Sequence, residues 1–406
     1  MFRLIALTGG LAVASVDATG VQAASFDFEE IATTEFLFNS FSDASINNND
    51  DLAFIGRSAL VANSSAVLVS QGNGDGTIVY ETTDGGPVAS FSRPPSINDN
   101  GIVAYSGRTD DNRSIVGIDD GGPGFLTYDS IPGSPVNRFS SVDINDSNQV
   151  VVIVTDGLTE TVRVYDTQPF DTLDLFNPAQ STLRSSGAPG ISETGLVAYE
   201  ITDFGDVVSG ARRQSIDMPN VSSVDFEASS TGITFNNLGM ADNGAIAYVR
   251  TDGSEATVVL FDQTQGLTDG VTTDIATFDG SVERIFSGVS INDSEEIAFS
   301  TIDDNGIFDT LYLWSGGTLF PILSNGDEID GLEVRNAFVS NQSLSNTGTL
   351  GLRIDLFDAD EGEGYQAIYR ARRIDDMNTP TPIPLPATGV LLLAGLSALR
   401  LARRKA

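Results

Sequence analysis

The chain has 406 residues, with 21 Lys and Arg against 56 Asp and Glu, a formal net charge of −35, and neither Cys nor His. A protein this acidic lacks the basic surface that contacts phosphates, so we expect no nucleic-acid partner. The missing residue types exclude disulfides, thiol nucleophiles, Ser-His-Asp triads and the usual transition-metal sites. Hydrophobic residues make up 40% and the chain contains 41 Gly, which is typical of a folded, turn-rich protein.

Residues 1–23 have the pattern of a secretory signal peptide. Arg3 precedes a mostly apolar run from Leu4 to Val16, and Val21-Gln22-Ala23 has the small-x-small form of a cleavage site. We predict export by the Sec machinery and cleavage after Ala23, with Ala24 as the alternative. A membrane helix that stays attached is the other interpretation, but the run is short and ends at Asp17.

One sequence element recurs seven times between residues 45 and 352. Its second copy reads SINDNGIVAY at 96–105, and the residue equivalent to Asn98 is called the anchor of each copy. Successive anchors are 51, 47, 47, 49, 51 and 53 residues apart, which indicates a tandem repeat of about 50 residues. The anchors are Asn47, Asn98, Asn145, Ser192, Ala241, Asn292 and Ser345.

Each copy predicts a tight turn followed by a buried strand. Asp-Asn-Gly, Glu-Thr-Gly and Asn-Thr-Gly favour tight turns because Gly accepts a positive φ, and an Asn or Ser anchor can bond its own backbone two residues on. The strand that follows is apolar on both faces, with Val103 and Tyr105 on one and Ile102 and Ala104 on the other. Neighbouring layers must therefore cover both faces.

About four short strands per repeat and almost no helical periodicity predict an all-β fold. We expect a seven-bladed β-propeller over residues 24–375, with another tandem-repeat β-solenoid as the alternative. The last repeat lacks an outermost strand, whereas Ser25–Ile31 is unassigned. We expect this N-terminal segment to complete the last blade, which would close the ring and cover its open edges.

The repeat resembles that of a family of bacterial extracytoplasmic proteins with tandem Asn-x-x-Gly-x-x-Ala-Phe repeats, over roughly residues 25–370. The resemblance implies the fold and an extracytoplasmic location but no activity. The sequence departs from the pattern where a turn Gly or an anchor Asn is replaced, and the turns that lack Gly are expected to be looser. The replacements are Asp50, Asn148 and Glu295 for Gly, and Ser192, Ala241 and Ser345 for Asn.

The chain ends in a linker and an apolar segment. Residues 376–382 include Thr379-Pro380-Thr381-Pro382, which predicts a stiff linker. An apolar stretch of about 16 residues follows from Pro384 to Leu399, and four basic residues lie beyond it. The positive-inside rule places the basic end in the cytoplasm and the rest of the chain outside. The stretch is short, so transient membrane occupancy fits better than a stable anchor.

Residues 383–406 resemble the PEP-CTERM class of bacterial sorting signals. The motif Ile383-Pro384-Leu385-Pro386-Ala387 is closest to the variant that reads Val-Pro-Leu-Pro-Ala, and here Ile383 stands in place of valine. The resemblance implies recognition and cleavage by an exosortase-type enzyme in a Gram-negative bacterium, often alongside exopolysaccharide and biofilm systems. An ordinary C-terminal membrane anchor is the other interpretation.

Without His and Cys, any bound metal must take oxygen ligands, as Ca²⁺ does. Two loops have suggestive spacing: Asp358, Asp360 and Glu363 in the first, and Asp303, Asn305 and Asp309 in the second. A third candidate is the loop Asn73–Gly76. None of these loops matches the complete twelve-residue calcium loop, and ordinary Gly/Asp turns are the alternative interpretation.

Two functions are compatible with these features. The first is a noncatalytic protein of the cell envelope or biofilm matrix, whose propeller loops bind carbohydrate or protein. The alternative is a secreted polysaccharide-active enzyme, a glycosidase or lyase, that uses a carboxylate pair in the propeller funnel. An enzyme should bring acidic and aromatic residues from several blades to one end of the channel, whereas a scaffold should not.

Overall fold

A computed structural model describes residues 25–374 apart from short gaps. The gaps are 35–36, 62–63, 72–76, 82–87, 92, 110–112, 120–125, 130–135, 157–158, 167–171, 176–182, 186–187, 204–207, 216–223, 232, 266–268 and 280–282. In the part that is described, every regular element is a β-strand, and no helix there is long and apolar enough to cross a membrane.

The described strands form seven antiparallel sheets, numbered 1 to 7 here in the order of their anchors. Sheet 1 contains β2 (Phe38–Phe41), β3 (Ser45–Ile46), β4 (Leu52–Ser58), β5 (Ser65–Ser70) and β6 (Thr77–Glu81). Sheet 2 contains β7 (Ser90–Phe91), β8 (Ser96–Ile97), β9 (Val103–Arg108), β10 (Ser114–Asp119) and β11 (Leu126–Asp129). Sheet 3 contains β12 (Val136–Ile144), β13 (Gln149–Asp156), β14 (Thr159–Asp166) and β15 (Thr172–Asp174).

The next three sheets repeat the same order. Sheet 4 contains β16 (Leu183–Ser185), β17 (Gly190–Ile191), β18 (Leu196–Asp203), β19 (Val208–Ser215) and β20 (Val224–Thr231). Sheet 5 contains β21 (Ile233–Met240), β22 (Ile246–Asp252), β23 (Glu255–Gln265) and β24 (Asp269–Asp279). Sheet 6 contains β25 (Glu283–Ile291), β26 (Ile297–Asp303), β27 (Phe308–Ser315) and β28 (Thr318–Ser324).

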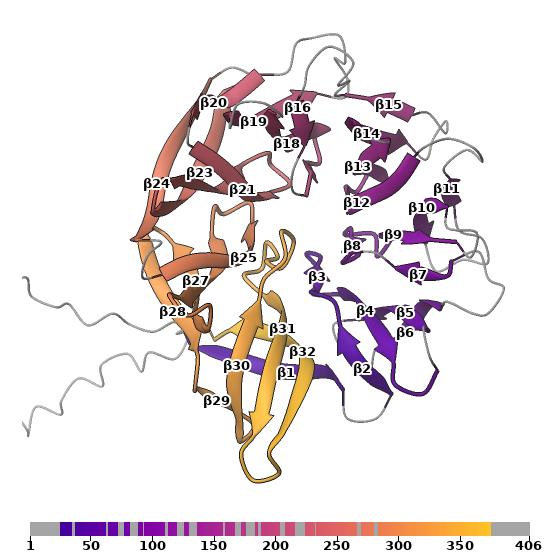
Figure 1. Cartoon of the computed structure of the whole chain (residues 1–406), viewed down its shortest axis with the longest axis vertical. Coiled ribbons are helices and arrows are strands. Elements are labelled where there is room, and N and C mark those ends of the chain that lie inside the picture. Colours follow the sequence, from indigo (N-terminus) through magenta and orange to yellow (C-terminus); the bar gives the residue numbers. More distant parts are fainter. Residues whose placement is uncertain are drawn as a thin grey trace, which may run out of the picture.

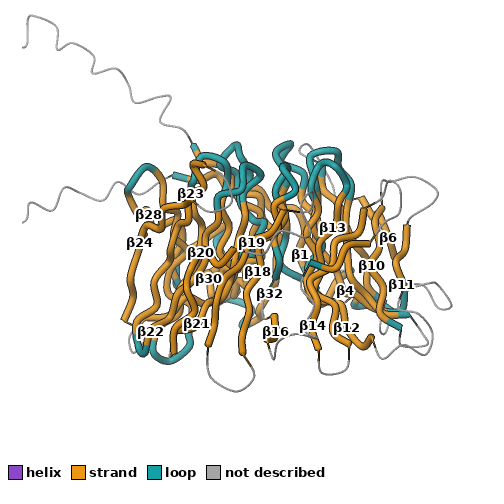
Figure 2. The backbone as a smooth tube through the Cα atoms, turned by 90° about the horizontal axis from the view of Figure 1, so that it is seen from above, coloured by secondary structure: helices purple, strands orange, loops and turns teal. Residues whose placement is uncertain are grey.

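Sheet 7 joins the two ends of the described chain. It contains β29 (Glu328–Ile329), β30 (Leu332–Phe338), β31 (Leu350–Asp358) and β32 (Glu363–Arg373), and its outermost strand is β1 (Phe26–Thr33). The sheets surround a central axis as a propeller-like ring (Figure 1), and loops cover both ends of it (Figure 2). The all-β class and the propeller-like ring confirm that part of the fold prediction.

The strand after each anchor turn packs against the sheets on both sides of it. On β9, Val103 and Tyr105 share a hydrophobic cluster with Ala53 and Val67 of sheet 1, whereas Ala104 lies in a cluster with Val150 of sheet 3. All three β9 side chains are fully buried. Burial of a large apolar side chain contributes roughly 1.5–3 kcal/mol, so most of the stability lies between sheets.

The seven anchor turns share one backbone conformation. The fourth residue of the turn has a positive φ where it is Gly, as at Gly101 (76°), and also where it is not, as at Asp50 (63°), Asn148 (62°) and Glu295 (59°). The left-handed conformation costs a residue with a side chain roughly 1–2 kcal/mol. The turns without Gly therefore keep the same shape at some cost, in contrast to the looser turns expected from the sequence.

Strand β1 closes the ring, as predicted for the N-terminal segment. It pairs antiparallel with β32, from Phe26 opposite Arg373 to Thr33 opposite Ala367, with an irregularity between Glu30 and Ala32. Ile368 of β32 is fully buried in the cluster that joins sheet 7 to sheet 1. The closed register does not fit an open solenoid.

Arg370 holds this closure from inside. Its side chain is fully buried and donates from Nη1 to Glu29 Oε2 of β1 (2.9 Å) and from Nε to the Asp50 carbonyl in the first anchor turn (3.0 Å). Nη2 lies 3.4 Å from the carbonyl and hydroxyl oxygens of Ser70 on β5. One guanidinium therefore connects β32, β1 and sheet 1.

Arg370→Ala should lower the free energy of unfolding by roughly 1.5–3 kcal/mol, because it leaves the buried oxygens of Ser70 and the partly buried Asp50 carbonyl without their charged donor. Urea denaturation followed by circular dichroism would measure the loss. The matched control is Arg335→Ala, since Arg335 makes an exposed ion pair with Glu333 (2.8 Å), and a change below about 1 kcal/mol is expected there. Equal losses in the two variants would contradict the role of Arg370.

Candidate functional site

The anchor side chains connect each turn to the next sheet. The Asn98 Oδ1 accepts the N–H groups of Asn100 (3.1 Å) and Ile102 (2.9 Å), while its Nδ2 donates to the Asn145 carbonyl (2.9 Å). Asn47, Asn145 and Asn292 make the same link to the following anchor carbonyl, at 2.9, 3.1 and 3.0 Å. The predicted Asx-turns are therefore present and also act between sheets.

The residue directly after each anchor carries a carboxylate or an amide. These seven residues are called the axial ring: Asn48, Asp99, Asp146, Glu193, Asp242, Asp293 and Asn346. The end of the ring of sheets that carries the anchor turns is called the anchor face. Six of the seven residues line a cavity at this end, together with buried apolar side chains such as Ile144 and Met240.

A chain of hydrogen bonds runs round the axial ring. The N–H of Asn48 donates to Asp99 Oδ1 (2.7 Å), that of Asp99 to Asp146 Oδ1 (2.8 Å) and that of Asp146 to Glu193 Oε1 (2.7 Å). On the other side, the N–H of Asp293 donates to Asn346 Oδ1 and that of Asn346 to Asn48 Oδ1, both at 2.7 Å. Each of these acceptors is thus held by the sheet before it.

The chain changes its pattern at sheet 5. The N–H of Glu193 donates to the backbone carbonyl of Asp242 (3.0 Å), and the next link runs from Asn243 N to Asp293 Oδ1 (2.8 Å). The Asp242 carboxylate instead crosses the axis, where its Oδ2 accepts the side-chain amides of Asn48 (3.0 Å) and Asn346 (3.1 Å). Sheet 5 is in this way bonded directly to sheets 1 and 7.

Asp143 makes a second connection across the axis. It is 2% exposed, and it accepts the N–H groups of Ile144 (2.7 Å) and Ile191 (2.9 Å) and the Ser96 hydroxyl (3.3 Å). The Gln342 amide, which comes from sheet 7, also contacts Asp143 Oδ1. Two side-chain connections therefore cross the axis near the anchor face.

The cavity between these groups is small and polar. Its volume is about 60 Å³, and its lining contains eleven Asn, Asp, Glu and Gln residues and eight apolar ones, none of which is aromatic or basic. That is room for a few water molecules, whereas sites for small organic ligands typically have volumes of about 300 Å³ or more.

Burial raises the proton affinity of several of these carboxyls. Desolvation raises the pKa of Asp143 to about 7, although the N–H donors of Ile191 and Ile144 oppose it. Desolvation and the negative charges of ring neighbours raise the pKa of Glu193 to about 7 and that of Asp242 to about 6. Part of this cluster therefore takes up protons near neutral pH.

The first predicted calcium loop forms the hairpin between β31 and β32. The Asp358 Oδ1 accepts the N–H groups of Asp360 (2.8 Å) and Glu361 (3.1 Å), and Glu363 lies beside the Tyr365 hydroxyl (3.5 Å). These contacts close the hairpin through its own backbone. In the structure the Asp358 carboxylate thus accepts hydrogen bonds within its own turn.

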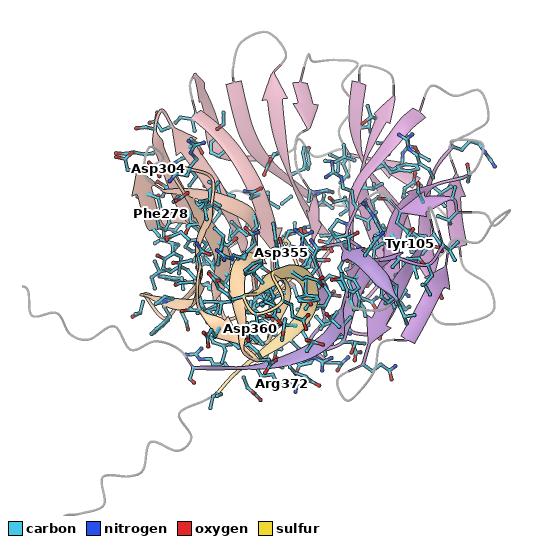
Figure 3. The ribbon with its side chains drawn as sticks, turned by 60° about the horizontal axis from the view of Figure 1, so that its bottom comes forward. Tyr105, Phe278, Asp304, Asp355, Asp360 and Arg372 are labelled. Atoms are coloured by element: carbon cyan, nitrogen blue, oxygen red, sulfur yellow. The ribbon has the colours of Figure 1, made fainter. Side chains whose placement is uncertain are left out.

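The second predicted loop is on a different sheet, as Asp304 and Asp360 show in Figure 3. The Asp303 Oδ1 accepts the N–H groups of Asn305 (2.9 Å) and Ile307 (2.8 Å), and Asp309 Oδ2 is 3.5 Å from the Thr310 hydroxyl. Among the residues that the structure describes, no three carboxylates lie close enough to hold a metal ion. Calcium binding at either loop stays a prediction.

Other predicted sites lie outside the described residues: the cleavage site at Ala23, the sorting motif 383–387, and the loop Asn73–Gly76. The axial ring, by contrast, was not singled out from the sequence. Its signal was an acid or amide directly after every anchor, in all seven copies.

Comparison with known proteins shows the fold alone. No protein-family model and no curated protein matches the chain. An oligogalacturonate lyase from Vibrio parahaemolyticus is similar in structure, with a TM-score of 0.56, 12% identity, and 87% of this chain and 99% of that chain covered. A second oligogalacturonate lyase, in complex with manganese, has a TM-score of 0.55 and 12% identity, with 87% of this chain and 98% of that chain covered.

A peptidase also shares the fold. Prolyl oligopeptidase B from Galerina marginata has a TM-score of 0.55 and 11% identity, with 83% of this chain and 52% of that chain covered. The chain thus spans about half the length of that peptidase. One architecture carries unrelated chemistries here, so the fold by itself assigns none of them.

Asp242→Asn should reduce the loss of stability at neutral pH. Because the pKa of Asp242 is raised to about 6, its native carboxyl binds a proton more tightly than the unfolded chain does. The stability that this proton uptake adds to the folded protein is fully present below about pH 4 and is lost as the pH rises through about 6. Asparagine keeps an acceptor for Asn48 and Asn346 without the charge, so the fall in melting temperature between about pH 4.5 and pH 8 should become smaller.

Two further variants separate charge from hydrogen bonding. Asp242→Ala should lower the melting temperature at both pH values, because it removes the acceptor of two amides. Asp304→Asn, at an exposed carboxylate outside the axial ring, should leave the pH dependence unchanged. A pH dependence that Asp242→Asn does not alter would contradict the assignment.

Proposed function

We propose that this protein is an exported, noncatalytic component of the cell envelope or biofilm matrix, which binds carbohydrate or protein through its loops. Its fold would be a closed propeller of seven blades. Seven sheets and seven hydrophobic clusters between neighbouring sheets support that number.

A noncatalytic function is supported mainly by the hydrogen bonds that the axial-ring carboxylates already accept from other sheets. The carboxylates of Asp99, Asp146, Asp242 and Asp293 each accept hydrogen bonds from another sheet. Glycoside hydrolysis needs two carboxylates on either side of a bound sugar, about 5 to 9.5 Å apart. A cavity of about 60 Å³ without aromatic side chains offers no room and no stacking surface for such a sugar.

A polysaccharide-active enzyme is the second candidate. Carboxylates from several sheets do converge at one end of the axis, and a pKa of about 7 for Glu193 is suited to a general acid. The aromatic residues that such an enzyme should add are missing from the cavity lining. The shared fold of the two lyases is compatible with either candidate.

A polysaccharide panel separates the candidates. We expect the purified full-length protein to bind one or more acidic or neutral polysaccharides and to release neither new reducing ends nor unsaturated sugars, with Ca²⁺ or with a chelator. Glu193→Gln should bind equally well. Turnover that disappears in Glu193→Gln would establish the enzyme instead.

A melting temperature that Ca²⁺ raises in the wild type but not in Asp358→Asn would support calcium at the first loop.

Export and sorting are the second part of the proposal. The signal-peptide pattern, the motif 383–387, the apolar segment and the basic end occur in the order that such a signal requires. An exosortase-type enzyme in a Gram-negative host would act on this tail. The mature part, without residues 1–23 and 387–406, has 16 basic and 55 acidic residues and a charge of −39, which favours solubility outside the cell.

Replacing Pro384, Leu385 and Pro386 by Ala should block sorting. We expect this variant to stay unprocessed in the membrane fraction of a host that has the sorting enzyme, as seen by its size and fractionation. The matched control replaces Pro380 and Pro382 in the linker, which should still be processed. Normal release of the triple variant would contradict recognition of the motif.

A further inference from the structure

The two ends of the described chain meet at one place. The N–H of Ile374 donates to the Ser25 carbonyl at 2.8 Å, directly beyond the pairing of Phe26 with Arg373. Any segment that precedes Ser25 and any that follows Ile374 therefore starts from the same corner of sheet 7. A membrane tether at either terminus would pull on that corner.

This corner belongs to the anchor face. Strand β32 runs from its hairpin with β31 back toward the seventh anchor turn, because Ala371 pairs with Leu350. Beyond that pair, the Arg372 Nε lies 3.5 Å from Asp50 Oδ2, and the Arg373 Nη1 lies 2.8 Å from Glu296 Oε1. Asp50 and Glu296 are in the anchor turns of sheets 1 and 6, so the chain leaves between two anchor turns (Figure 3 labels Arg372).

The linker is shorter than the strand that it would have to run along. Nine residues, 375–383, lie between Ile374 and the apolar segment, and they can span at most about 32 Å even when fully extended. Strand β32 has 11 residues and is about 36 Å long. If the face opposite the anchor face lay on the membrane, the linker would have to cover at least the length of β32, which it cannot do.

We propose that, while the apolar C-terminal segment is in a lipid bilayer, the anchor face is turned toward that bilayer and the opposite face points outward. This rests on the proposed function, since it needs the segment 384–399 to be inserted. The outward face then presents the exposed side chains of Leu60 (73% exposed), Val61 (59%) and Ile307 (50%) to the surroundings.

The short linker to the membrane segment sets this orientation, and attraction between the anchor face and the lipids does not. The anchor face carries the five carboxylates of the axial ring, which anionic lipids would repel. The orientation should therefore be the same in vesicles of zwitterionic lipid and at high salt, where surface charges are screened. Lengthening the linker should abolish it.

The chain contains no Cys, so single labels can be placed without background. Ser294→Cys and Asp304→Cys are both exposed and flank β26 of sheet 6, on the anchor face and on the opposite face respectively. With a donor dye on each in turn, energy transfer to an acceptor lipid would be measured for the full chain in phosphatidylcholine vesicles. We expect greater transfer from Ser294→Cys, since seven strand residues, about 23 Å, separate the two positions.

A flexible Gly/Ser insertion of about 20 residues after Asp376, which adds roughly 25 Å of average reach, should remove the difference. Equal transfer from the two positions with the native linker, or greater transfer from Asp304→Cys, would overturn the proposed orientation. Such a result would not contradict membrane insertion of the C-terminal segment. A full chain that does not float with the vesicles would overturn the membrane tail itself, and the orientation with it.

Discussion

The burial of one strand between two neighbouring sheets is the interaction on which the rest of the molecule depends. In each repeat the strand after the anchor turn is apolar on both faces, as in Val103, Ala104 and Tyr105, so no sheet can bury its own core alone. Stacking continues until the last sheet meets the first, and there β1 and the fully buried Arg370 complete it. The anchor amides and the axial ring add a polar layer that holds the sheets in register at the centre.

Much of this fold could be predicted from local patterns. The 50-residue spacing, the Gly turns and the two-faced strand of residues 102–105 are properties of short segments, and they indicate an all-β repeat fold. The unassigned segment after Ser25 indicated the closing strand. These inferences needed no knowledge of which residues from different repeats come together.

The site could not be predicted in the same way, because its members are far apart in sequence. The Asp242 carboxylate meets Asn48 across 194 positions, and Gln342 meets Asp143 across 199. Which acids are buried near others, and so have raised pKa values, depends on these meetings. The acid-rich loops at Asp303 and Asp358 were conspicuous in the sequence, yet their carboxylates cap their own hairpins.

Pairing β1 with β32 also fixes the order in which the protein can be completed. The first strand to emerge from a ribosome or a translocation channel must wait for the last, since Phe26 pairs with Arg373. Until then the sheets can stack only as an open arc, with the apolar face of sheet 1 that packs against Ile368 and the acceptors for Arg370 exposed. Contacts so distant in sequence make folding slow. The final closing step therefore belongs to the full-length chain, and any product that stops before β32 remains an open arc.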